Sequence, residues 1–259
     1  MKSSLLEHLE VDYTHSTTND YVTHCLWCGA ESKLSISKEE GNVFQCWKCH
    51  EKGNGLSFMR KWFNLLPEIT VAQARDFVNR KKGVVPSVLK SEDIRYDNRN
   101  FWFPVRNTKG DIIALHKFDT TSGIIYASPK PFNCSILGMQ HNTGKTEELW
   151  IAEGHADYLI LRGLMAKMKE PQDSIGTCGA GFSGSYLHLL SDRNIILLFD
   201  NDDAGRTGIQ SVARRIKTSG INVKSIKYLD WTTIPVPGMT EIPSGFDLRD
   251  LNNAYSGSL

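Results

Sequence analysis

Residues 194–208 read NIILLFDNDDAGRTG, and this stretch decides the fold. Its apolar run predicts a buried strand, which ends abruptly in Asp200, with Asp202 and Asp203 close behind. Carboxylates crowded at the end of a buried strand repel one another, so their placement costs stability unless a cation offsets it. Because strand side chains alternate between faces, we expect Asp200 and Asp202 on one side as a convergent pair. We expect Asp203 to cap the helix that follows.

A second strand is predicted over Leu149–Ala152, and it runs into the acidic turn Glu153-Gly154-His155-Ala156-Asp157. From about residue 147 onward, predicted strands alternate with predicted helices, which indicates a mainly parallel sheet covered by helices. Ligand sites in such sheets lie at the carboxyl ends of the strands. If the two strands are neighbours, Glu153 meets Asp200 and Asp202 at one edge of the sheet.

A third acidic stretch, Asp247-Leu-Arg-Asp250, follows a Pro/Gly-rich loop over residues 235–245. Carboxylates that converge in one cleft bind hard divalent cations such as Mg²⁺ or Mn²⁺. Two such ions can clamp the attacking and leaving oxygens of a phosphoryl transfer. For the Asp200/Asp202 pair alone, an acidic helix cap with solvated loops is the simpler interpretation. The separate acidic turn after a second strand favours the metal site.

The composition is that of an ordinary globular protein, with 259 residues, 40% apolar and 23% charged. No apolar run approaches the roughly 20 residues that span a bilayer, and acids stand where a signal peptide would be apolar, so we expect a cytoplasmic protein without membrane contact. The net charge of +1 is unevenly spread, at −3 over residues 1–59, +6 over 60–130 and −2 over 131–259. The basic middle fits either a polyanion partner or a solvated lysine-rich surface.

Four of the six cysteines form two CxxC units, Cys25–Cys28 and Cys46–Cys49. Each unit is a tight turn that aims two thiolates at one point, and paired units in a reducing compartment indicate a tetrahedral zinc site. The metal would stabilise a small ribbon that has little core of its own. Trp27 and Trp47 lie inside the two turns, where they could stack on nucleic-acid bases or pack under the metal.

The patterns predict three parts: a zinc ribbon over residues 1–56, a basic mixed α+β subdomain over 57–146, and an α/β domain over 147–259. The middle part contains two amphipathic helices, over 57–66 and 70–82, and two strands within 101–118 that turn at Asn107–Gly110. The expected fold class is therefore α/β (α+β).

Several motifs resemble one family. Glu153-Gly154-x-x-Asp157 followed by Asp200-x-Asp202-x-Ala-Gly205 resembles the TOPRIM domain that primases, topoisomerases and some nucleases share. The stretches CWKCHEKGNGLSF (46–58) and FPVRNTKGDIIALHKF (103–118) resemble the zinc module and the core strand pair of bacterial replicative primases and of the primase half of phage primase–helicases. Ser128-Pro129-Lys130 resembles a later Pro-Lys of that core. The resemblance runs in order from about residue 20 to 255.

The resemblance implies a DNA primase, which makes short RNA primers on single-stranded DNA from ribonucleoside triphosphates by two-metal nucleotidyl transfer. Glu153, Asp200, Asp202 and Asp247 would hold Mg²⁺ or Mn²⁺, and four cysteines would hold structural Zn²⁺. The expected nucleotide or DNA contacts are Arg106, Lys117, Lys130, Arg206, Trp27 and Trp47. Phe246 departs from the family, in which Lys is common before the third acid. A separate replicative helicase and a phage or plasmid origin are further expectations.

Two alternatives remain open on the sequence. A TOPRIM nuclease uses the same acids, and RNA synthesis or DNA cleavage in a template assay would discriminate it from a primase. A non-catalytic zinc-ribbon module that binds single-stranded DNA would not need intact Glu153, Asp200 and Asp202.

Overall fold

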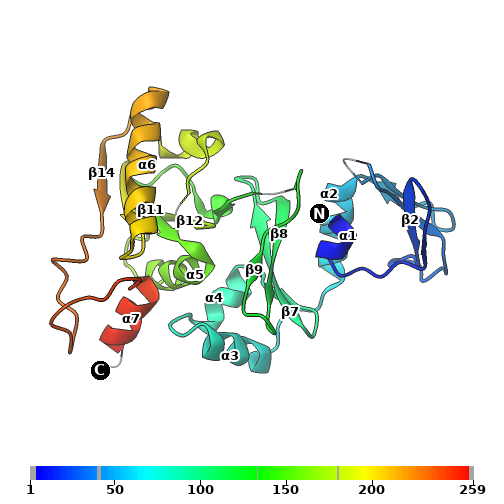
Figure 1. The fold of residues 1–259 in the computed structure, drawn as a ribbon, viewed down its shortest axis with the longest axis horizontal. Helices are drawn as coiled ribbons and strands as arrows, with labels where there is room; N and C mark the ends of the chain where they lie inside the picture. Colours follow the sequence, from blue (N-terminus) through cyan, green and yellow to red (C-terminus); the bar gives the residue numbers. More distant parts are fainter. Residues whose placement is uncertain (1–3, 40–41, 133, 180, 257–259) are drawn as a thin grey trace. The chain divides into compact units, whose positions relative to one another are not determined.

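The computed structural model describes residues 4–39, 42–132, 134–179 and 181–256, and the chain forms two compact units. The first unit contains Met1–Glu68, Asp93–Pro104 and Ile112–Cys134, and the second contains Ile69–Glu92, Val105–Asp111 and Ser135–Leu259. The elements mix helices and strands, as the predicted α/β (α+β) class requires (Figure 1). In the described part of the chain, no helix combines the length and the apolar character that crossing a bilayer needs.

A five-stranded antiparallel sheet carries the cysteine turns, and its order is β1-β2-β3-β4-β5. In β3, Leu34 and Ile36 are buried and alternate with half-buried neighbours, which is the two-residue period of a strand with one covered face. A short helix, α1 (Leu5–His8), precedes the sheet and begins with a capping box between Ser4 and Glu7. The strands are β1 (His15–Ser16), β2 (Asp20–Thr23), β3 (Leu34–Ser37), β4 (Phe44–Cys46) and β5 (Lys52–Gly53).

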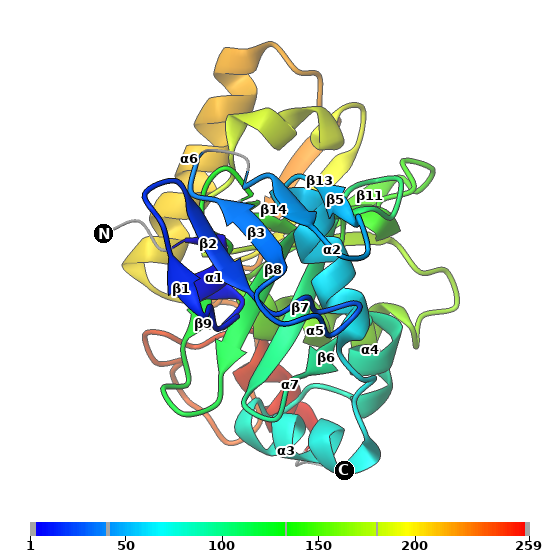
Figure 2. The same cartoon turned by 90° about the vertical axis from the view of Figure 1, so that its right-hand side faces the viewer.

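A second, four-stranded sheet contains the two strands predicted within residues 101–118. Its order is β6-β7-β8-β9, with β7 and β8 side by side in Figure 2. Asn107 and Gly110 form the predicted turn, in which the Gly110 N–H donates to the Asn107 carbonyl at 3.0 Å. The strands are β6 (Arg95–Tyr96), β7 (Asn100–Arg106), β8 (Ile112–Asp119) and β9 (Ile125–Tyr126).

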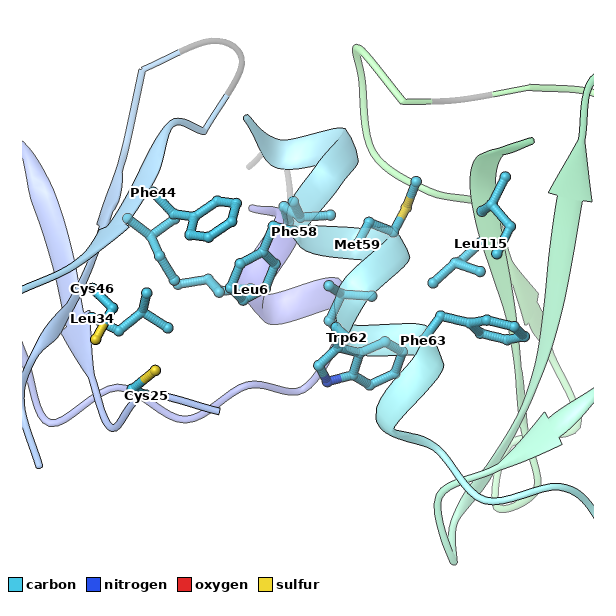
Figure 3. Packing of buried hydrophobic residues seen from close by; sticks show 14 of the residues in the cluster. Leu6, Cys25, Leu34, Phe44, Cys46, Phe58, Met59, Trp62, Phe63 and Leu115 are labelled. Carbon is cyan, nitrogen blue, oxygen red and sulfur yellow. The ribbon is translucent and has the colours of Figure 1, made fainter. Parts of the chain in front are cut away.

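Helix α2 (Gly55–Leu65) joins the cysteine-bearing sheet to β7 and β8 through one core (Figure 3). Its Phe58 ring lies 5.4 Å from Phe44 of β4, while its Trp62 ring lies 4.7 Å from Trp102 of β7. Burial of each such side chain contributes about 2 kcal/mol. The small ribbon therefore gains from this helix an apolar core that its own strands could not supply.

The second unit is built on a mainly parallel sheet of order β10-β12-β11-β13-β14, as the alternating pattern predicts. Only β10 runs antiparallel to its neighbour among these described strands. The strands are β10 (Ile136–Leu137), β11 (Glu148–Glu153), β12 (Asp173–Thr177), β13 (Asn194–Leu198) and β14 (Ser225–Tyr228). The sheet places the ends of β11 and β13 next to each other, which decides where the acids meet.

Helix α5 packs against β11 and β12 of this sheet (Figure 1). A Thr70 and Gln73 capping box begins α3, close to the start that the sequence predicts. The helices of the unit are α3 (Val71–Arg80), α4 (Pro86–Ser91), α5 (Gly154–Met165), α6 (Asp203–Ser219), α7 (Leu248–Ser256), and the 3₁₀ turns η1 (Met139–His141) and η2 (Gly184–Leu190).

Candidate active site and four-cysteine centre

Two acids meet at the carboxyl edge of the parallel sheet, as the neighbouring-strand hypothesis requires. Strands β11 and β13 pair in parallel, with Ala152 opposite Leu198. Glu153 ends β11, and Asp200 follows β13 by two residues. The backbone N–H of Asp200 donates to Glu153 Oε2 at 3.4 Å, so the two acidic turns are in direct contact.

Two glycines make these turns possible. Gly154 has φ of +80°, a left-handed conformation that strains residues with a side chain. Gly205 lies so close to the chain before it that a Cβ atom would stand 2.2 Å from the Asp200 carbonyl oxygen. The glycines let the chain fold back sharply beside Glu153 and Asp200, and the second keeps helix α6 directly against the acidic turn.

The N-cap of α6 is Asp202, so the expectation that Asp203 caps this helix is wrong. Asp202 has extended backbone, and its Oδ1 accepts from the Gly205 N–H at 2.7 Å. Asp203 is the first helical residue, and its exposed side chain pairs with Arg206 at 2.7 Å. The close approach of Gly205 starts the helix one residue early, and the cap bond then fixes the orientation of the Asp202 carboxylate.

Asp247 is brought to the same edge by the loop before it. Asn201 exchanges backbone hydrogen bonds with this loop: its N–H donates to the Phe246 carbonyl and its carbonyl accepts from the Gly245 N–H, each at 2.8 Å. Asp247 is buried, whereas the Asp250 side chain is 41% exposed. Of the two acids in this stretch, Asp247 is therefore the one that joins the cluster.

Asp157 is a fifth member of the cluster that the predicted ligand set omitted. It lies one turn into α5, which places it on the same helix face as Glu153. Its side chain is buried, and its Oδ1 accepts from the Arg249 backbone N–H at 3.0 Å. The signal was present in the sequence, because Glu153-Gly154-x-x-Asp157 has the four-residue spacing of one helical turn.

Burial and repulsion by neighbouring carboxylates raise the pKa values of Glu153, Asp157, Asp200 and Asp247. Burial, followed by the charge of Glu153 and the other acids, raises the pKa of Asp200 to about 8. Burial and then Asp247 raise the pKa of Asp157 to about 7. Burial also raises the pKa values of Glu153 and Asp247. The cluster therefore retains protons near neutral pH, and a divalent cation that bound there would displace them.

Two basic residues that the sequence did not single out face part of this cluster. The Arg249 guanidinium donates from Nη2 to Asp247 Oδ2 at 2.5 Å. Lys81 follows α3, where burial and then the charge of Arg249 lower its pKa while Asp157 and Asp247 act to raise it. Lys81 comes from a segment distant in the sequence from the acidic stretches, whereas Arg249 lies within the stretch Asp247-Leu-Arg-Asp250. The sequence alone does not indicate that either residue lies near Asp157.

The four predicted thiolates converge on one point. All four Sγ atoms of Cys25, Cys28, Cys46 and Cys49 lie within 4.8 Å of one another. The pairs Cys25–Cys49 and Cys28–Cys46 are each 3.8 Å apart. A tetrahedral zinc site with bonds of about 2.3 Å has sulfurs about 3.8 Å apart, so the spacing fits zinc.

Backbone N–H groups support this centre. Lys48 and Cys49 direct their N–H groups at Cys46 Sγ, at 3.4 and 3.5 Å. Burial acts to raise the pKa of the Cys46 thiol, but these N–H groups together with the Cys49 and Cys25 thiols outweigh it and lower the pKa to about 6. Such contacts favour the thiolate form that binds a metal. The four cysteines thus form a zinc-ribbon-like centre.

Residues 150–233 match the Toprim-like family. The second unit contains a Toprim-like domain. A sequence relative is the uncharacterised protein MG010 homolog of Mycoplasma pneumoniae, 27% identical over 109 residues. That match covers 39% of this chain and 48% of the relative, so it spans about half of the relative's length.

Solved structures extend the similarity beyond the Toprim-like domain. The zinc-binding and RNA polymerase domains of the Aquifex aeolicus primase match with a TM-score of 0.53 at 14% identity, over 96% of this chain and 79% of that one. A DnaG primase catalytic domain bound to single-stranded DNA matches with a TM-score of 0.57 at 14% identity, over 78% of this chain and 76% of that one. The E. coli primase catalytic core matches with a TM-score of 0.55 at 13% identity, over 78% of each chain. This chain therefore has the fold of the TOPRIM-type primases.

The tryptophans of the two CxxC turns, Trp27 and Trp47, differ in their surroundings. Trp27 is half-buried, with its ring 5.2 Å from Phe44 and 5.7 Å from Phe58. Trp47 is 62% exposed, and its Nε1 donates to Ser35 Oγ at 3.2 Å. Trp27 therefore packs into the apolar core, whereas stacking of Trp47 on a base stays a prediction.

The predicted basic contacts fall in different places. Lys117 and Lys130 line one pocket of about 640 Å³ together with Tyr126, and Lys117 pairs with Glu10 at 2.8 Å. Arg106 donates from Nη1 to the Gly110 carbonyl at 2.9 Å, at the turn after β7. Arg206 belongs to the first turn of α6 in the Toprim-like domain and pairs with Asp203, as described above. Lys117 and Lys130 thus share one pocket of the first unit, whereas Arg106 and Arg206 belong to the second unit.

Proposed function

We propose that this protein is a DNA primase that synthesises short RNA primers on single-stranded DNA from ribonucleoside triphosphates. The main observation in support is the cluster of buried and half-buried carboxylates at the carboxyl edge of the Toprim-like sheet. Such a cluster is costly without cations, and it occurs in a chain that also has the four-cysteine centre of the primase fold.

In this proposal, the acids of the Toprim-like domain bind Mg²⁺ or Mn²⁺. Glu153, Asp200, Asp202 and Asp247 are the proposed ligands, and Asp157 joins them because it lies in the same buried cluster. When bound, the divalent ions would activate a primer 3′-hydroxyl and stabilise the pyrophosphate leaving group. The residues themselves supply a fixed array of oxygens, oriented by the cap bond of Asp202 and the hydrogen bond between the Asp200 N–H and Glu153.

The other unit would bind the polyanionic substrates. Lys117 and Lys130 line one pocket together with the Tyr126 ring and the acids Glu7 and Asp119. In this proposal the two lysines and the aromatic ring contact a nucleotide or template segment. Arg106 and Arg206, which belong to the second unit, are proposed as additional phosphate contacts. Trp47 would stack on a template base, since its ring is exposed next to the proposed Zn²⁺ centre.

The test is incubation of the full chain with ribonucleoside triphosphates and a panel of defined single-stranded templates. We expect short RNA products that require Mg²⁺ or Mn²⁺. Asp202→Asn should lower product formation by about 100-fold or more, although Asn preserves the helix cap to Gly205. The matched control is Asp203→Asn, which removes an exposed carboxylate one residue away and should leave synthesis intact.

Two outcomes would overturn the proposal. Cleavage of the DNA without RNA synthesis would favour a TOPRIM nuclease, which would use the same acids. Binding of single-stranded DNA without either reaction, unchanged by Asp202→Asn, would favour a non-catalytic module.

A further inference from the structure

Helix α6 lies in a stretch of strongly uneven charge (Figure 1). Residues 204–229 contain six lysines and arginines and no aspartate or glutamate. The longer segment over 131–259, in contrast, has a net charge of −2. Positive charge is therefore concentrated on and just after α6, within a part of the chain that is otherwise acidic.

Three of these cations project from the solvent side of α6. The buried residues of the helix form one stripe along it, Gly205, Gly208, Val212 and Ile216. At about 100° per residue, Arg214 and Lys217 lie about 80° and 20° around the axis from Arg206, on the side away from that stripe. All three side chains are exposed, and they extend over about 16 Å of the helix axis.

Arg214 and Lys217 carry charges that no acid balances among the described residues. Arg206 pairs with Asp203 at 2.7 Å, whereas no ion pair or side-chain hydrogen bond joins Arg214 or Lys217 to another residue in the described part of the chain. A solvated helix face usually mixes both signs, because like charges three or four residues apart destabilise a helix. The helix dipole favours Lys217 in the last turn but gives no reason for the other two cations.

We propose that the basic face of α6, which consists of Arg206, Arg214 and Lys217, binds the phosphates of single-stranded DNA. The inference rests on the proposed function, which supplies the template as the partner. Helix α6 starts at the acidic edge of the sheet, so a strand held on this face would run from the acids toward Ser219. Cations spread along the helix suit successive phosphates, since each phosphate that a cation neutralises releases bound counter-ions.

The other side chains of the basic face also suit a sugar-phosphate backbone. Thr207 and Gln210 lie between the cations, and both can donate hydrogen bonds to phosphate oxygens. Helix α6 contains no aromatic residue, so it offers no surface on which bases could stack. Binding to this face should therefore be independent of base sequence and strongly dependent on salt.

The test is the salt dependence of DNA binding by the zinc-loaded full chain. Fluorescence anisotropy of a labelled oligothymidylate, over a series of KCl concentrations and without ribonucleotides, gives the slope of log K against log salt. Each phosphate contact on a single strand adds about 0.7 to this slope, so the double variant Arg214→Gln/Lys217→Gln should lower it by about 1.4. Both positions are exposed and Gln is as good a helix former as Arg and Lys, so the fold should persist.

Arg215→Gln is the matched control. It removes the same charge from the next residue of the helix, whose guanidinium turns toward η2: a Cβ atom on Gly184 would stand 3.7 Å from Arg215 Nη1. The slope should stay at its wild-type value in this variant. The charge-conserving double variant Arg214→Lys/Lys217→Arg should also retain that slope.

The outcomes separate this inference from the proposed function. An unchanged slope in the folded Gln double variant, or an equal decrease in Arg215→Gln, would overturn the inference and leave the proposed function standing. A wild-type chain that makes no RNA primers but shows the expected decrease would instead count against the proposed function. The two single Gln variants should each lower the slope by about 0.7, so the test remains available if the double variant does not fold.

Discussion

Replacing Asp157 by Asn should stabilise the Toprim-like domain when divalent ions are absent, even though Asp157 belongs to the candidate site. Burial and the nearby Asp247 raise the pKa of Asp157 from its usual 3.8 to about 7. Asn has the same shape, carries no charge, and its side-chain oxygen can still accept from the Arg249 N–H. The substitution therefore removes the cost of ionising a buried acid and keeps its hydrogen bond.

The sign and size of the effect follow from the two pKa values. The unfolded chain ionises Asp157 above about pH 4, but the folded chain retains the proton until about pH 7, so the wild type loses stability across that interval. The difference is about 3 pKa units, and each unit is worth about 1.36 kcal/mol. Asp157→Asn should thus raise the free energy of unfolding by about 4 kcal/mol at pH 8, and by about 2 kcal/mol at pH 5.5.

The assay is urea unfolding in divalent-free buffer with the cysteine centre zinc-loaded, followed by pulse proteolysis. The surviving fragments of the Toprim-like domain report its stability separately from the other unit. Asp203→Asn is the control and should change stability by less than about 0.5 kcal/mol at either pH. A gain that is equal at the two pH values, or a loss at pH 8, would refute the burial argument. Saturating Mg²⁺ should shrink the gain, because the ion then offsets the charge in the wild type.

Three further predictions concern other parts of the chain. Cys46→Ser should abolish zinc binding and unfold the first unit, as zinc quantification and circular dichroism would show; retention of one zinc would contradict the four-sulfur site. Gly205→Ala should destabilise the Toprim-like domain by about 2 kcal/mol or more in urea titrations, because the added methyl group meets the Asp200 carbonyl oxygen. Trp47→Ala should weaken binding to single-stranded DNA by about 1–3 kcal/mol with unchanged stability. Trp27→Ala should instead lower stability, and the reverse pattern in fluorescence anisotropy and melting experiments would reject this assignment.

Local periodicity was enough to predict the sheet and much of the acidic edge. The run before Asp200 has the length of one buried strand, and the turn after Ala152 begins with Glu153, so parallel pairing alone brings the two acids together. The two CxxC units were equally informative, because their spacing constrains four thiolates without reference to the rest of the fold. These features depend on residues that are close in sequence or on a single pairing rule.

The remaining features depend on tertiary packing. The cap moves from Asp203 to Asp202 because Gly205 packs onto the Asp200 backbone, which no propensity scale includes. The difference between Trp27 and Trp47 arises from α2, whose Phe58 covers only one of them. Arg249 lies in the acidic motif itself, yet its hydrogen bond to Asp157 became visible only when α7 placed it there.

The backbone bridge between Asn201 and Phe246 has a consequence for local opening and closing of the acidic cluster. It ties the loop before Asp247 to the turn that carries Asp200 by two backbone hydrogen bonds, and the Asn201 side chain donates to the Ile242 and Pro243 carbonyls, whereas β11 and β13 are joined along their whole length. Opening this loop should therefore require far less free energy than opening the sheet. In native-state hydrogen exchange, we expect the Asn201 and Gly245 amides to exchange well before those of β11 and β13. A polypeptide that has folded its sheet can thus still lack Asp247, so completion of the acidic cluster is a late and separately reversible step.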